Sequence, residues 1–191
     1  EAVPIEVLDA ASLLWRLHLD GVDVGGRFAR LAETWAPKVL DAPWYAFNDA
    51  HAVMALVGAG RLDDARLVVA RLDAWVGSTS GSNVRMTTDV GLPVCRALVA
   101  FAEERYEDAV SELAPVRTTA NRFGGSHAQR DVVERTLLEA ALRAGCDDLA
   151  LALTAERVGQ RDASVYGWAQ RARALRAVDQ PDRAEVAAAR A

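Results

Sequence analysis

The sequence predicts an all-α fold of stacked antiparallel helix pairs, about five in number. Alanine is the commonest apolar residue, and aromatic residues make up only 6% of the chain. Small side chains let helices approach closely, and Ala, Leu, Arg and Glu all favour helix. Apolar residues recur three or four positions apart, and a similar turn-and-helix motif occurs four times. Together these features favour helix-on-helix packing.

Ten segments have helical periodicity, and Gly or Pro residues separate most of them. Pro37 and Pro43 are predicted to bracket the loop after the second helix, and residues 77–83 to form a flexible loop. Pro93 and Pro115 fall inside the fifth and sixth segments, where we expect a late start or a kink. The predicted helices span about 4–19, 25–35, 44–59, 62–76, 88–103, 106–122, 126–144, 147–158, 162 or 164 to 178, and a short last helix after residues 179–182.

The four similar motifs place an alanine five residues after a turn position. They are Gly60-Arg-Leu-Asp-Asp-Ala65, Glu104-Arg-Tyr-Glu-Asp-Ala109, Gly145-Cys-Asp-Asp-Leu-Ala150 and Asp179-Gln-Pro-Asp-Arg-Ala184. The alanines are 44, 41 and 34 residues apart. Paired helices approach to about 8–10 Å, so a small residue is needed where they cross. The preceding helices offer Val53, Leu56, Ala97, Ala100, Leu138, Ala141, Ala172 and Leu175 to these crossings.

These motifs resemble the tetratricopeptide repeat, in which a Gly-x-aromatic-Glu-Glu-Ala turn opens the second helix and the period is about 34 residues. We therefore expect a tetratricopeptide-like α-α superhelix that forms a single domain over residues 1–191. A generic alanine-rich helical bundle stays open as the alternative.

Three longer segments resemble the tetratricopeptide repeat protein 38 family and its bacterial relatives. They are residues 12–27, residues 47–61 and Gly124-Gly-Ser-His-Ala-Gln-Arg-Asp131. The likeness covers residues 10 to about 145 and fades after Gly145. It implies a helical repeat protein whose longer form has a further N-terminal half, and it carries over no reaction. Because the chain opens at Glu1 directly in a helical pattern, we expect it to be a fragment of a longer protein.

Charge and composition limit the classes of partner. The net charge of −5 and the pI of about 5.2 argue against binding nucleic acid. The longest uncharged apolar run, residues 97–102, is too short to cross a membrane. Cys95 and Cys146 belong to no CxxC motif, so we expect two free thiols in the cytoplasm, with a disulfide between them as the alternative.

In such a superhelix the first helix of each pair lines a concave groove, which suits a peptide or a partner helix. We therefore expect a protein-interaction scaffold, although any of these side chains could instead pack against the next repeat. Self-association into a homodimer through an uncapped end is a further alternative. The predicted groove residues are Phe47, His51, Met54, Cys95, Leu98, Arg135, Glu139, Gln170 and Arg173.

Two polar clusters could instead form a small-molecule or catalytic pocket. One contains Asn48, Asp49 and His51, and the other lies near His127 and Arg130. The simpler explanation of the first is a helix cap with a half-buried histidine. The simpler explanation of the second is a salt-bridged first helical turn.

Catalysis has little support in the sequence. No HxxxH or HExxH spacing links the histidines, and the GxGxxG and GxxxxGK[ST] motifs are absent, so we expect neither a metal nor a cofactor. Ser126 and His127 would point about 100° apart on a helix. A Cys95–His51–Asp49 arrangement on neighbouring helices is conceivable, but we expect a non-enzymatic protein.

Overall fold

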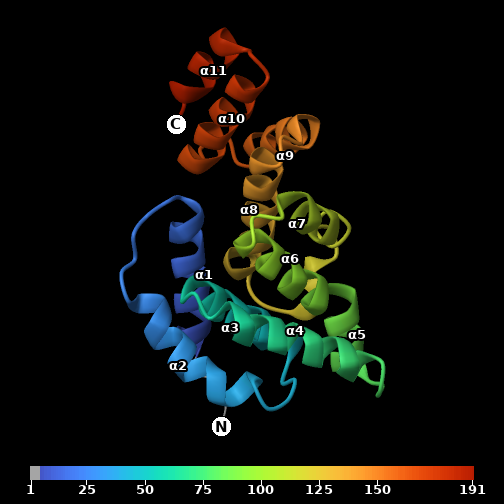
Figure 1. Cartoon of the computed structure of the whole chain (residues 1–191). Coiled ribbons are helices and arrows are strands. Elements are labelled where there is room, and N and C mark those ends of the chain that lie inside the picture. The colour runs from blue at the N-terminus through green and yellow to red at the C-terminus, as the bar shows by residue number, and fades with distance from the viewer. Residues whose placement is uncertain (1–4) are drawn as a thin grey trace. The chain divides into compact units, whose positions relative to one another are not determined.

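A computed structural model describes residues 5–191 of the chain (Figure 1). The described residues form helices joined by turns and contain no β-strand, which confirms the all-α prediction. A π-helical turn at Thr87–Gly91 and a 3₁₀ turn at Ala120–Phe123 accompany the α-helices. The α-helices are α1 (Ile5–Leu19), α2 (Arg27–Val39), α3 (Ala46–Gly58), α4 (Leu62–Val76), α5 (Ser82–Met86), α6 (Leu92–Ala102), α7 (Tyr106–Leu113), α8 (His127–Arg143), α9 (Asp147–Gln160), α10 (Val165–Ala177) and α11 (Pro181–Ala188).

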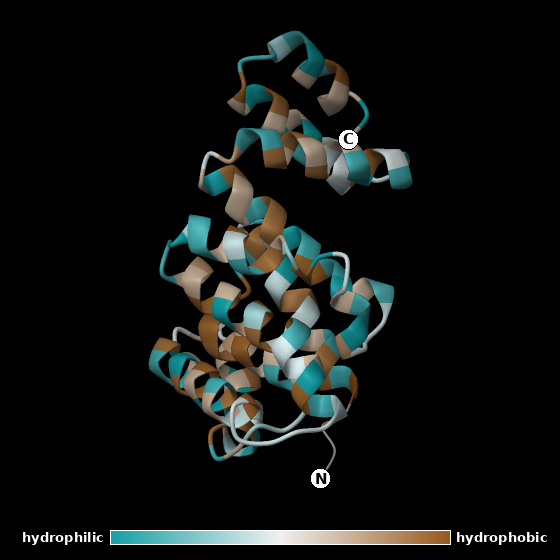
Figure 2. Cartoon of the chain, turned by 90° about the vertical axis from the view of Figure 1, so that its right-hand side faces the viewer, coloured by the Kyte–Doolittle hydropathy of each residue, from teal (hydrophilic) through white to brown (hydrophobic). Residues whose placement is uncertain are grey.

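The chain divides into two compact units, which we describe separately. The first unit ends at Leu137 and the second covers Leu138–Ala191, so α8 contributes to both. Figure 2 shows hydrophobic and hydrophilic residues alternating along the helices, as expected for helices with one buried face. The single-domain organisation over residues 1–191 stays a prediction.

The four predicted turn positions share one backbone conformation. Their φ angles are all positive, at 72° for Gly60, 59° for Glu104, 68° for Gly145 and 54° for Asp179. After each turn position, the next N–H bonds back to a carbonyl five residues earlier, as in a Schellman motif. The donor–acceptor pairs are Arg61–Leu56, Arg105–Ala100, Cys146–Ala141 and Gln180–Leu175, at 2.9 to 3.0 Å. The sequence repeat is thus a structural repeat of the helical hairpin.

The alanine of each motif is buried on the helix that follows the turn. Ala65 and Ala109 are fully buried, and Ala150 and Ala184 are 1% exposed. All eight residues that we expected opposite them on the preceding helices are also buried. The prediction that small residues fill these interior positions is therefore confirmed.

We expect Glu104→Gly to raise the free energy of unfolding by about 0.5–1 kcal/mol, because glycine adopts a left-handed conformation without the steric cost that glutamate has there. Glu104 has an exposed side chain at φ 59°, so little contact is lost. Gly60→Ala is the matched opposite change at φ 72° and should destabilise by a similar amount. Urea unfolding of both variants tests this. A loss of stability in Glu104→Gly would contradict it.

In the first unit, α3 packs against α1, α2, α4 and α6. Trp15 on α1 is fully buried, and its indole N–H donates to Thr136 Oγ1 on α8 at 2.9 Å. Its ring also lies 6.1 Å from that of Phe101 at the end of α6. A second bond joins α1 to α8, from Gln129 Nε2 to Asp9 Oδ1 at 2.9 Å. The inner face of these helices is therefore a packed interior.

The second unit has its own apolar core. Helix α10 packs against both α9 and α11. Ala172 and Leu175 of α10 cluster with Ala184 and Ala187 of α11, and Trp168 packs against them. Ser164 caps α10, as its Oγ accepts a hydrogen bond from the N–H of Gly167 at 3.0 Å.

Two predicted boundaries near the prolines were wrong. Helix α2 continues through Pro37 to Val39, because Trp35, Ala36 and Val39 are buried and their packing stabilises the last turn. The predicted sixth helix does not reach residue 122. It ends at Leu113, since Pro115 cannot continue the backbone hydrogen bonding of a helix.

The fifth helix also begins earlier than predicted. Helical structure starts at Ser82, within the segment expected to be a flexible loop, and the π turn joins α5 to α6. That turn directly precedes Pro93. A proline ring clashes with the carbonyl four residues earlier in a regular α-helix, and a wider turn relieves this clash.

Candidate functional site

His51 on α3 is an internal residue of the first unit. Its side chain is 1% exposed, and Nδ1–H donates to the Phe47 carbonyl at 2.7 Å. That leaves Nε2 to accept a hydrogen bond from Ser12 Oγ on α1 at 2.8 Å. Burial lowers the pKa of His51 to about 4, against the opposing effects of the Phe47 carbonyl and Asp9. A neutral, fully bonded imidazole therefore ties α3 to α1.

Asp49 is also 1% exposed, but it points elsewhere. Residues two positions apart on a helix face opposite sides, so Asp49 and His51 diverge. Asp49 Oδ1 accepts the Trp44 N–H at 3.2 Å, whereas Oδ2 has no hydrogen-bond partner. Burial raises the pKa of Asp49 to about 7, although backbone bonds from Trp44 and Tyr45 oppose the shift. Burial, with a smaller effect of Asp49, also raises the pKa of the Cys95 thiol.

The second polar cluster forms the start of α8. Ser126 and Gln129 exchange hydrogen bonds between side chain and backbone at 3.2 and 2.8 Å, so Ser126 is the N-cap of α8. The Arg130 guanidinium folds back to donate to the carbonyls of Gly124 and Gly125. Its Nη2 lies 3.4 Å from His127 Nδ1. Arg130 therefore stabilises the glycine turn before its own helix.

Three residues of the predicted small-molecule pocket, Asp49, His51 and Arg130, bond to other groups. Within residues 5–191, Asn48, Asp49, His51 and Arg130 form no hydrogen bond with one another, and Asn48 is only half-buried. The same part of the chain has no group of His, Cys, Asp or Glu side chains suited to a metal ion. Both cysteines are free thiols.

The predicted groove residues of the first unit lie mostly in its interior. Phe47, Met54, Cys95 and Leu98 are at most 5% exposed, on helices α3 and α6, which pack against each other. Arg135 keeps 16% of its side chain exposed, and it contacts Asp131 at 2.8 Å and Asp20 at 3.6 Å. These side chains therefore do not line an open groove.

In the second unit, the structure brings predicted groove residues together. Arg173 Nη1 on α10 donates to Glu139 Oε2 on α8 and to Gln170 Oε1, each at 2.8 Å. Arg143 Nε donates to Glu139 Oε1 at 2.8 Å. Burial of Glu139 favours its neutral form, but the bonds from Arg173 and Arg143 prevail and hold its pKa below the usual value. The arginine side chains stay 44% and 40% exposed.

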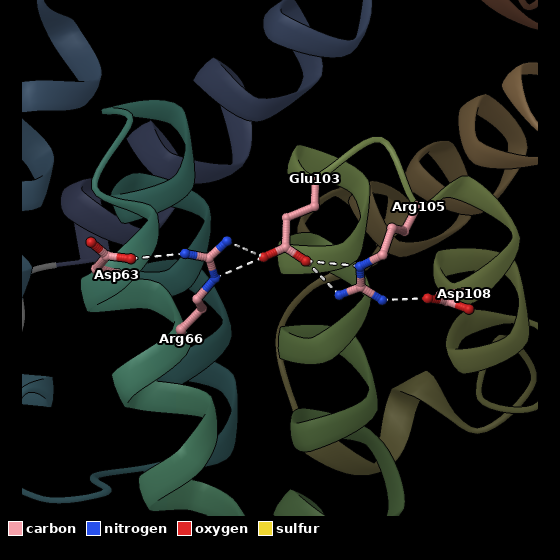
Figure 3. A network of polar contacts seen from close by, with 5 residues as sticks. All are labelled: Asp63, Arg66, Glu103, Arg105 and Asp108. Atoms are coloured by element: carbon pink, nitrogen blue, oxygen red, sulfur yellow. Dashed lines mark hydrogen bonds and ion pairs between the residues drawn. The ribbon is translucent and has the colours of Figure 1, made fainter.

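An ion-pair network joins neighbouring hairpins of the first unit (Figure 3). Glu103, at the turn after α6, binds Arg66 of α4 at 2.6 Å and Arg105 at 2.5 Å. Arg66 also contacts Asp63, and Arg105 contacts Asp108. The Arg105 hydrogen bond is the main reason that the pKa of Glu103 is lowered. Because half-exposed pairs of this kind contribute at most about 1 kcal/mol each, we assign the network a structural role.

A groove of about 650 Å³ that the sequence did not predict lies in the second unit, between α9 and α11 over α10. Trp168, Val158 and Val186 line it, together with Arg171 and Arg183. The sequence shows a tryptophan, Trp168, followed by several arginines. It does not show which of these side chains lie on one surface, because that depends on how α10 and α11 pack.

No protein-family model matches the chain, and no solved structure is significantly similar to it. Over the part that the structure describes, none of the helices has the length and apolar character needed to span a membrane.

Proposed function

We propose that the chain is a tetratricopeptide-like repeat protein related to the tetratricopeptide repeat protein 38 family, and that it acts as a cytoplasmic scaffold for protein partners. The main support for this proposal is a repeated hairpin. Each of four hairpins has the same turn geometry and a buried alanine five residues after the turn position. Repeats of this kind present rows of equivalent side chains on successive helices, which suits the binding of an extended peptide or a partner helix.

The binding surface that we favour is the α8–α10 face of the second unit. Glu139 and Arg173 are 34 residues apart, in equivalent positions of successive pairs. The Glu139 carboxylate is buried and orients Arg173 and Arg143, whose side chains remain partly exposed. Guanidinium groups held in this way bind a carboxylate with little further loss of side-chain freedom.

A random peptide display library panned against the whole chain tests the proposal. Peptides that are enriched should bind the Arg143→Ala/Arg173→Ala double variant at least about tenfold more weakly, since the loss of even one hydrogen bond to a charged group costs about 1.5–3 kcal/mol. We choose Arg143 instead of Arg135, because 40% of the Arg143 side chain is exposed and only 16% of the Arg135 side chain.

Arg30→Ala on α2 is the matched control, as it removes an exposed arginine from the first unit. Its affinity for the enriched peptides should equal that of the unmodified chain. Failure to enrich any peptide, or equal binding by the double variant, would count against this surface.

A further inference from the structure

The groove between α9 and α11 exposes apolar surface. Trp168 forms part of it, Val158 lies on the α9 side, and Val186 on the α11 side is 67% exposed. Arg190 stacks over the Trp168 ring, with its guanidinium carbon 3.9 Å from the ring centre. Five charged side chains line the groove, and the three arginines Arg171, Arg183 and Arg190 outnumber the two acids Asp162 and Asp182.

The repeat provides an internal comparison for this groove. In the first unit, the equivalent groove between α4 and α7 over α6 has about 420 Å³. Aligning Ala109 with Ala184 places Arg96 opposite Arg171, both thirteen residues before the alanine. In the first groove, Arg96 binds Asp73 at 2.6 Å. Asp73 corresponds to Val158 when Ala65 is aligned with Ala150, so the second groove lacks this acid.

A second replacement changes the charge in the same direction. Asp108, which pairs with Arg105 in the first unit, corresponds to Arg183, one residue before the buried alanine. The two grooves are built from equivalent helices. In the first groove, Asp73 and Asp108 pair with arginines. In the second groove, Val158 and Arg183 stand at the positions of these two acids.

The arginines of the second groove have no carboxylate partner among residues 5–191. Arg171 donates to the Leu151 carbonyl at 2.7 Å and to Thr154 Oγ1 at 3.2 Å. Arg183 donates to Gln180 Oε1 at 2.5 Å. Burial and, less strongly, the nearby charge of Arg183 lower the pKa of Arg171, so the two cations face the same region. A carboxylate from outside would relieve this repulsion.

We propose that the α9–α11 groove binds an amphipathic helical segment of a partner protein that carries carboxylates beside an apolar stripe. The apolar side chains pack on Trp168, Val158 and Val186, and a carboxylate meets Arg171 and Arg183. This surface differs from the α8–α10 face, and the inference does not depend on binding there.

The probe is a fluorescein-labelled Leu/Glu peptide with leucines at helical spacing, compared with a twin in which each Glu is Gln. Fluorescence anisotropy with the whole chain should show about tenfold tighter binding of the Glu peptide. Arg183→Glu should weaken binding of the Glu peptide by about tenfold or more, and Val186→Ser should weaken binding of both peptides. We leave Arg171 unchanged, because its bonds to Leu151 and Thr154 hold α10 to α9.

Arg176→Glu is the matched control, since Arg176 is exposed on α10 and does not line the groove. It should bind the Glu peptide as the unmodified chain does, and so should the Arg143→Ala/Arg173→Ala variant. Circular dichroism checks that each variant is folded. Equal affinity for the two peptides, unchanged binding by Arg183→Glu, or an equal loss in Arg176→Glu would each overturn the proposal.

Discussion

Replacing Ala109 with leucine is expected to lower the free energy of unfolding of the first unit by about 3 kcal/mol, the upper part of the range for overpacking a dense core. Ala109 is fully buried on α7, which packs against α6. Three added carbon atoms have no space at this position, so the two helices must separate or the leucine must adopt a strained rotamer. Urea unfolding followed by circular dichroism measures the loss.

The matched control for Ala109→Leu is Ala152→Leu, because Ala152 is an exposed residue within α9. Both substitutions exchange one good helix former for another, so the control should change stability by no more than about 0.5 kcal/mol. Similar losses in the two variants would show that the position in the hairpin is not what requires a small residue.

Asp49 and His51 are expected to give opposite pH dependences of stability between about pH 4 and 7. Burial raises the pKa of Asp49 from 3.8 to about 7, because the folded chain favours the neutral carboxyl. The stability that Asp49 contributes is therefore complete below pH 3.8, and it is lost as the pH rises through 7. Burial lowers the pKa of His51 from 6.5 to about 4, so its contribution is complete above pH 6.5 and is lost as the pH falls through 4. Each shift corresponds to a free energy on the order of 4 kcal/mol, and the two effects largely cancel in the unmodified chain.

Single substitutions should reveal each contribution. The stability of Asp49→Asn relative to the unmodified chain should fall by a few kcal/mol as the pH is lowered from 7 to 4, because the gain from protonating Asp49 is missing. The relative stability of His51→Gln should rise over the same range. Urea unfolding from pH 4 to 8 measures both. Parallel pH profiles for the two variants and the unmodified chain would contradict the burial argument.

Local signals in the sequence predicted the hairpins well. The turn-and-alanine motif depends only on residues close together in the sequence. In all four motifs the turn residue has a positive φ angle and the alanine is buried. The Ser126 cap of α8 is equally local, since it depends on residues three positions apart. The proline boundaries were less predictable, because packing of Trp35 and Val39 outweighed the local effect of Pro37.

The candidate site was harder to predict. Assigning Phe47, Met54 and Leu98 to an open groove assumed that each hairpin contacts only its neighbours. In the structure, α1 also contacts α8, and no local pattern reports a pairing of Trp15 with Thr136. The basic groove of the second unit depends likewise on which side chains of α9, α10 and α11 share a surface.

The bond between Trp15 and Thr136 has a consequence for biosynthesis. It joins residues 121 positions apart, and the Gln129–Asp9 bond spans 120. As the chain leaves the ribosome, the early hairpins can form from local contacts, but the indole N–H of Trp15 has no acceptor until Thr136, in the middle of α8, has been synthesised. Closing so long a loop carries an entropic cost that local hairpins avoid. A nascent chain stalled before α8 should therefore be more sensitive to proteases than one released after it.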